Sequence, residues 1–145
     1  MYLHVTAVIM SSVLALPALA GDTVFSAIQK REAVWSGHFA QNEMTEVGAM
    51  YEEHAWLISP GAAPLKGREE ILGAVSVLRK NTARLALTTV AVEPVGADYA
   101  IENGVAEMVG AGDASNSVGR ANYQVLWHRS NEGVWLIIRD MISPM

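Results

Sequence analysis

The chain has 145 residues, with 10 Lys or Arg, 15 Asp or Glu and no Cys, and 51% of its residues are hydrophobic. This size and balance fit one globular domain and exclude a disordered chain. The formal charge of -5 at pH 7 removes the attraction to phosphate on which nucleic-acid binding depends. Without cysteine, the chain forms no disulfide, thiolate nucleophile or cysteine-based zinc site.

The amino-terminal segment differs in composition from the rest, because no Asp, Glu, Lys or Arg precedes Asp22. Its apolar run over 5–20 ends in the Ala-x-Ala pattern of a signal-peptide cleavage site. We predict a signal peptide over 1–20, cut after Ala20, a domain over 21–145, and a periplasmic or secreted location without membrane association after cleavage. Because a basic segment is missing, a buried amino-terminal helix and a wrongly assigned start codon are the alternatives.

Apolar residues at helical spacing predict three helices in the first half of the domain. The third helix is expected from Arg68 to about Lys80. The predicted apolar faces are Phe25, Ile28, Trp35 and Phe39, then Met44, Val47, Met50 and Tyr51, then Ile71, Val75 and Leu78.

Strand-forming segments dominate the second half. Two short extended segments, 55–58 and 64–65, precede the third helix, and the long runs after it are 85–93, 99–109, 117–129 and 134–142. The short turn segments between these long runs predict hairpins. The resulting fold class is α+β, with three helices covering one face of a strongly curved, mostly antiparallel sheet of about six strands.

The last two strands carry apolar residues on both faces. By alternation, Val125 and Trp127 lie opposite Leu126, and Ile137 lies opposite Leu136. A sheet with one solvated face alternates more cleanly, so we predict a homodimer through the second, convex face. Strong curvature of the sheet within one chain is the alternative.

Four sequence segments, in this order and spacing, resemble the SnoaL-like branch of the nuclear-transport-factor-2-like superfamily, which includes ketosteroid isomerase. They are YEEHAWLISPG at 51–61, LKGREEI at 65–71, YQVLWHR at 123–129 and GVWLIIRDM at 133–141. The resemblance implies a cone-shaped half-barrel, a pocket between helices and sheet, and frequent dimerisation through the convex face. Its members include isomerases, polyketide cyclases, dehydratases and transport adaptors, so it does not define the function.

The resemblance also places Ser59 where the isomerases have their catalytic carboxylate, just before the proline that follows the first strand. A hydroxyl does not remove a proton from carbon unaided, so the resemblance argues against true ketosteroid isomerase activity. His54 occupies a position at which relatives commonly carry Asp, and it is a candidate base; a structural role is the alternative.

Asp140 is the leading candidate acid or base, since alternation places it with Ile138 and Ile142 in a strand that is otherwise poor in charge. The polyketide cyclases that the chain resembles use an aspartate in this role. The alternative is a structural ion pair between this carboxylate and one of three arginines, Arg120, Arg129 or Arg139.

Several further residues are candidates for the pocket wall, although core packing explains each of them equally well. They are Trp35, His38, Tyr51, Trp56, Ser59, Tyr123 and Trp127. Glu32 lies on the apolar stripe of the first helix and points either inward or to solvent. Glu102 and Glu107 have opposite parity in their strand, so at most one of them faces a pocket.

The predicted partner is a small hydrophobic molecule, with no nucleic acid, no cofactor and no metal, because the histidines lack metal-ligand spacing. Three functions remain open at this point. They are proton transfer by Asp140 and His54 of isomerase, cyclase or dehydratase type, ligand binding without catalysis, and assembly through the convex sheet face.

Overall fold

The computed structural model describes residues 23–114 and 117–145. The predicted signal peptide, residues 1–20, lies outside the described residues. The three helices are α1 (Val24–Ala40), α2 (Met44–Ala49) and α3 (Arg68–Asn81). Thr23 caps α1, because its hydroxyl accepts a hydrogen bond of 3.2 Å from the backbone N–H of Ser26. Within the described residues, no helix combines the length and the apolar character needed to cross a bilayer.

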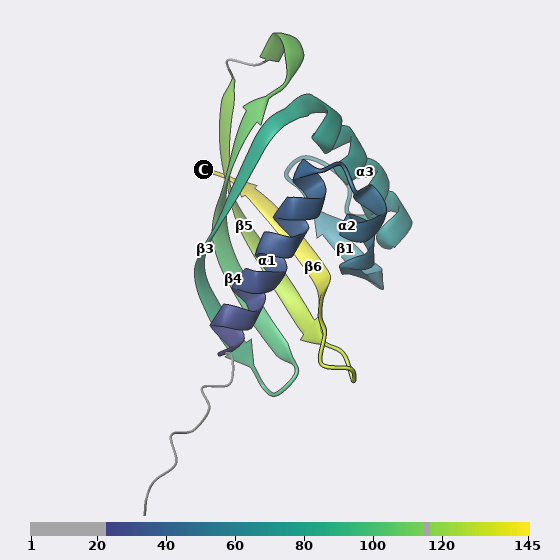
Figure 1. Ribbon diagram of the computed structural model, residues 1–145, viewed down its shortest axis with the longest axis vertical. Coiled ribbons are helices and arrows are strands. Elements are labelled where there is room, and N and C mark those ends of the chain that lie inside the picture. The colour runs from purple at the N-terminus through teal and green to yellow at the C-terminus, as the bar shows by residue number, and fades with distance from the viewer. Residues whose placement is uncertain (1–22, 115–116) are drawn as a thin grey trace, which may run out of the picture.

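Six strands form one sheet in the order β2-β1-β6-β5-β4-β3. Their bounds are β1 (Tyr51–Ile58), β2 (Leu65–Lys66), β3 (Thr82–Val95), β4 (Tyr99–Gly110), β5 (Val118–Arg129) and β6 (Trp135–Pro144), and the short helix η1 (Gly112–Ala114) follows β4. All neighbouring pairs are antiparallel except β1 and β6, which are parallel. Figure 1 shows α1 lying across the curved sheet, with α2 and α3 grouped near β1.

This arrangement confirms the predicted α+β architecture of three helices on a mostly antiparallel six-stranded sheet. The largest difference in element boundaries lies at the start of β1, which was predicted at 55 and begins at Tyr51. Tyr51 was assigned to the second helix, but α2 ends at Ala49 and Tyr51 begins β1. The reason is pairing with β6, because the Ile137 N–H donates to the Met50 carbonyl over 2.9 Å and Tyr51 pairs with Ile137.

A β-bulge in β6 determines which side chains face the helices. In the pairing with β5, Trp127 is opposite Ile137 and Leu126 is opposite Arg139, so Ile138 is an extra residue. Simple alternation would place Asp140 on the face opposite Ile137. The extra residue reverses the alternation, and both Ile137 and Asp140 therefore lie on the concave, helix-covered face.

The hydrophobic core fills most of the space between helices and sheet. Its fully buried side chains come from every layer and include Ile28 on α1, Val47 on α2, Ile71 on α3, Tyr51 on β1 and Trp127 on β5. Part of the remaining space forms a cavity beneath α1, which holds the candidate site.

Candidate functional site

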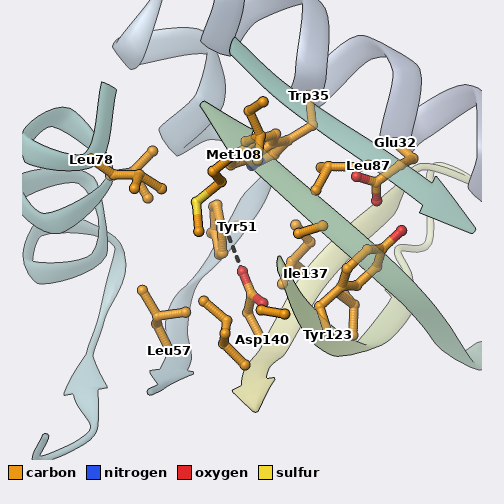
Figure 2. Close-up of a pocket in the computed structure, with 16 residues that line it drawn as sticks. Glu32, Trp35, Tyr51, Leu57, Leu78, Leu87, Met108, Tyr123, Ile137 and Asp140 are labelled. Carbon is orange, nitrogen blue, oxygen red and sulfur yellow. Dashed lines mark hydrogen bonds between the residues drawn. The ribbon is translucent and has the colours of Figure 1, made fainter. Parts of the chain in front are cut away.

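An apolar cavity of about 110 Å³ lies between the helices and the concave face of the sheet. Its sixteen lining residues are Glu32, Trp35, Tyr51, Leu57, Val75, Leu78, Leu85, Leu87, Ala106, Met108, Ala121, Tyr123, Val125, Ile137, Asp140 and Ile142 (Figure 2). A dry engineered cavity of roughly 150 Å³ binds benzene. This cavity therefore fits a ligand of about one ring, and the flexible side chain of Met108 in its wall can adjust to the ligand's shape.

Asp140 presents a carboxylate to this cavity from β6. The Tyr51 hydroxyl donates a hydrogen bond of 2.9 Å to its Oδ2 atom (Figure 2). Burial raises the pKa of Asp140 to about 6, the Tyr51 hydrogen bond opposes this shift, and the negative charge of Glu102 adds to it. Asp140 can therefore both accept and release a proton near neutral pH.

Glu102 is a fully buried carboxylate on β4, next to the cavity. Three side chains donate hydrogen bonds to it. The hydroxyls of Thr89 and Tyr123 donate to Oε1 over 2.7 and 3.1 Å, and the indole N–H of Trp127 donates to Oε2 over 2.9 Å. Donors of this kind stabilise an ionised carboxylate in a dry interior.

Glu32 on α1 is the third acid and is only 8% exposed. Burial raises its pKa to about 9, with additional contributions from the negative charges of Glu102 and Asp140 and from a side-chain hydrogen bond with Glu102. At neutral pH Glu32 is therefore a neutral carboxylic acid that can donate a hydrogen bond.

Trp35 adds a hydrogen-bond donor to the apolar wall. Its indole Nε1 is buried and has no partner of normal hydrogen-bond geometry. Burial raises the pKa of Tyr51, and the Trp35 indole near the Tyr51 hydroxyl lowers it in part. Because buried donors normally have partners, this N–H needs an acceptor, and the Tyr51 hydroxyl is one that lies within its reach.

The position of Tyr123 depends on Gly104, its partner across the strands β4 and β5. A Cβ atom at residue 104 would lie 2.1 Å from Cζ of Tyr123 and 2.3 Å from its hydroxyl oxygen. Only glycine lets the tyrosine ring lie flat across β4 and reach Glu102.

The electrostatic character of the cavity is acidic, since its lining includes Glu32 and Asp140 and contains no Lys, Arg or His. A neutral or cationic ligand is favoured over an anion. Within the part of the chain that the structure describes, no three His, Asp or Glu residues are arranged to hold a metal ion.

The structure brings four of the nine predicted site residues together in the cavity wall, and these are Trp35, Tyr51, Tyr123 and Asp140. The arginines considered as partners of Asp140 are engaged elsewhere. Their contacts are Arg120 with Glu107, Arg129 with Asp98, and Arg139 with the carbonyl of Ile138 and the ring of Trp56.

The other five predicted residues do not line this cavity. His54 is exposed on β1 and is not paired with Asp140. The Nδ1 atom of His38 lies 2.6 Å from Oε2 of Glu43. Ser59 directly follows the end of β1. The cationic groups of Lys66 and Arg139 lie over the ring of Trp56. The indole N–H of Trp127 donates a hydrogen bond to Glu102.

Sequence reasoning left Glu32 and Glu102 out of the predicted site. The signal for Glu32 was its place on the apolar stripe of α1 between Ile28 and Trp35, all of which are buried. For Glu102 the signal was strand parity. Glu102 shares the concave face with Ala100 and Gly104, whereas Glu107 is paired with Arg120 at the surface.

These features define a class: an α+β domain whose bent sheet and helices enclose an apolar, acid-containing cavity. Comparison with solved structures shows that this is the nuclear-transport-factor-2-like, or cystatin-like, fold. No family model matches the sequence, and no curated protein matches it.

Three solved structures illustrate the similarity. A ketosteroid isomerase-like protein from Erwinia carotovora atroseptica has 22% identity, a TM-score of 0.69, and coverage of 83% of this chain and 95% of that chain. A candidate calcium/calmodulin-dependent protein kinase II association domain from Xanthomonas campestris has 19% identity, a TM-score of 0.73, and coverage of 96% and 98%. A candidate scytalone dehydratase from Novosphingobium aromaticivorans has 14% identity, a TM-score of 0.72, and coverage of 83% of both chains. At these identities the likeness shows the fold alone.

Proposed function

We propose that this domain binds a small, mainly apolar molecule of one or two fused rings, about one ring of which the cavity encloses, and transfers a proton on it without a cofactor. One observation carries the proposal: Asp140, with a pKa of about 6, borders an apolar cavity. A base whose pKa lies near the working pH combines a large ionised fraction with adequate basicity. The isomerase-like and dehydratase-like names of two structural neighbours agree with chemistry of this type.

Size and charge narrow the substrate class. A cavity of about 110 Å³ lies well below the several hundred cubic ångströms of drug-sized pockets, so a steroid does not fit. We expect the buried Trp35 Nε1, which has no well-formed hydrogen bond, to bind an acceptor oxygen of the ligand, and no cation in the lining balances an anionic substrate. The expected substrate is a neutral carbonyl or hydroxyl compound of one or two fused rings.

Base-catalysed ring opening of 5-nitrobenzisoxazole tests the proposal, because this probe loses a proton from carbon and releases a coloured phenolate. We expect catalysis to rise with pH through about 6 and the rate to fall by about 100-fold in Asp140→Asn, the lower end of general-base effects. Asp98→Asn is the matched control, since Asp98 is exposed and paired with Arg129. Equal rates for wild type and Asp140→Asn would refute proton transfer by Asp140.

We also propose export of the domain to the periplasm or outside the cell, on the basis of the signal-peptide pattern over 1–20. Expression of the full-length gene in a bacterial host, followed by mass measurement of the periplasmic fraction, tests this. The expected mature chain begins at Gly21, and a product that retains Met1 would overturn the assignment.

Assembly through the outer sheet face is the second candidate function, favoured by Leu126, Leu136 and Ile138, which point away from the core and stay partly exposed. The occupant we propose is a second copy of this chain. Sedimentation equilibrium tests it, with a dimer expected for wild type and a monomer for Leu136→Lys. A monomeric wild type would refute it.

A further inference from the structure

Glu32 lies at the boundary between two hollows. It lines the inner cavity, and it also lines a groove between α1 and β3. The groove has a polar wall that includes Gln29, Ser36, Thr88 and Thr89. Glu32 therefore borders the ligand cavity on one side and this groove on the other.

The hydrogen bonds of Glu102 determine which carboxyl of the pair carries the proton. The Trp127 indole can only donate, so Oε2 of Glu102 must accept, while Oε1 accepts from the Thr89 and Tyr123 hydroxyls. Two ionised carboxylates in hydrogen-bond contact repel each other in a dry interior. Glu102 thus has three donors of its own, and Glu32, whose pKa burial raises to about 9, carries a proton at neutral pH.

Glu32 and Asp140 approach the cavity from opposite layers, the first from α1 and the second from β6 (Figure 2). Asp140 accepts a hydrogen bond from Tyr51, whereas Glu32 is hydrogen-bonded to Glu102, which also accepts from Tyr123. A neutral acid and an ionisable base that border one cavity at different places can act on two different atoms of the same ligand.

We propose that Glu32 is the proton donor of this site and is recharged with a proton from water through the groove between α1 and β3. The proposal rests on the proposed function, in which Asp140 is the base. The C–H bond of the ligand breaks, its proton moves to Asp140, and its electron pair shifts toward an oxygen atom that takes the proton of Glu32.

The proton balance closes through solvent. After the transfer, Asp140 is protonated and Glu32 is ionised beside the ionised Glu102, which is unfavourable because of charge repulsion. Glu32 regains a proton from water in the groove, and Asp140 releases one. The class of ligand that uses both groups is a neutral molecule with an oxygen that gains negative charge when a nearby C–H bond is broken.

Two benzisoxazoles test the donor directly in the domain over 21–145. Ring opening of 5-nitrobenzisoxazole releases a weakly basic phenolate that needs little protonation, whereas unsubstituted benzisoxazole releases a more basic one. We expect Glu32→Gln, which keeps a hydrogen-bond donor for Glu102, to slow the parent compound by about 100-fold and the nitro compound by less than about 3-fold. Glu107→Gln, an exposed carboxylate on β4, is the matched control.

Infrared spectroscopy gives a readout that does not depend on turnover. At about pH 7.5, wild type and Asp140→Asn should show the carbonyl band of a buried, protonated carboxylic acid, and Glu32→Gln should lack it. A missing band in wild type, or a band that survives in Glu32→Gln, would overturn the donor role.

The kinetic outcomes separate this inference from the proposed function. An equal slowing of both benzisoxazoles in Glu32→Gln would indicate a structural role for Glu32, and unchanged rates for both would exclude it as donor. Either result leaves Asp140 as the base if Asp140→Asn is inactive. Full activity of Asp140→Asn would instead refute the proposed function and, with it, the paired transfer.

Discussion

Replacement of Glu32 by Gln should change the pH dependence of folding stability. Burial beside Glu102 raises the pKa of Glu32 to about 9 in the folded chain, whereas the group titrates near 4.3 in an unfolded chain. The folded-state pKa is the raised one, so this stabilisation is complete below about pH 4 and is lost as pH rises toward about 9. Between those values, the unfolded chain releases a proton that the folded chain keeps.

The magnitude follows from one proton per molecule. For a difference of one bound proton, the unfolding free energy falls by about 1.4 kcal/mol for each pH unit. Wild type should therefore lose about 2 kcal/mol of unfolding free energy between about pH 7 and about pH 8.5. Urea denaturation at both pH values measures this loss. Glu32→Gln has no titrating group at that position, so its unfolding free energy should change little between the two pH values. The contributions of all other titrating groups are common to both proteins and cancel in the difference between them. Parallel pH curves for the two proteins would refute the assignment of Glu32 as a neutral acid.

Three further substitutions test the cavity wall. Tyr51→Phe removes the hydrogen bond that lowers the pKa of Asp140, so the midpoint of the 5-nitrobenzisoxazole pH–rate profile should rise by about one unit; an unmoved midpoint would contradict it. Gly104→Ala should lower the unfolding free energy by about 2–4 kcal/mol in urea, because the new methyl displaces Tyr123. Trp35→Phe should reduce the calorimetric preference for phenol over toluene by about 5-fold, the value of one hydrogen bond.

Matched variants keep these results interpretable. Gly73→Ala adds the same methyl at an exposed helical position with open space around it and should stabilise by up to about 1 kcal/mol. If Gly104→Ala were as harmless as Gly73→Ala, the close approach of the Tyr123 ring would be contradicted. For Trp35→Phe, a loss of toluene binding equal to that of phenol would mean altered packing rather than a lost donor.

The fold class could be predicted from the sequence, because the patterns that indicate it depend on local residue spacing. The apolar stripes of α1 and α3 and the turn segments between the long strands were enough to predict three helices on a bent sheet. The start of β1 was misplaced because Tyr51 completes a plausible helical stripe. Its strand conformation depends on pairing with β6, which lies about 85 residues later in the chain.

The site was less accessible to sequence reasoning, and Asp140 shows why. Alternation along 135–142 placed Asp140 on the same face as Ile138, whereas the bulge at Ile138 turns Asp140 to the face of Ile137. A bulge arises from the register of two distant strands, and nothing in the residues of β6 alone reveals it. Asp140 was thus assigned to an apolar face by an alternation that the bulge overturns.

Strand register also sets how the three acids divide their roles. Val125 is the partner of Glu102 on one side and of Asp140 on the other, so two strand spacings of roughly 5 Å separate these backbones by about 10 Å. At that separation each carboxylate has its own donors: Thr89, Tyr123 and Trp127 in addition to Glu32 for Glu102, and the Tyr51 hydroxyl for Asp140. Glu32 then keeps its proton at neutral pH, while the carboxylate of Asp140 can take one up. A second strong donor to Asp140 would lower its pKa and weaken it as a base, so the sparse solvation of this carboxylate is what suits it to proton transfer.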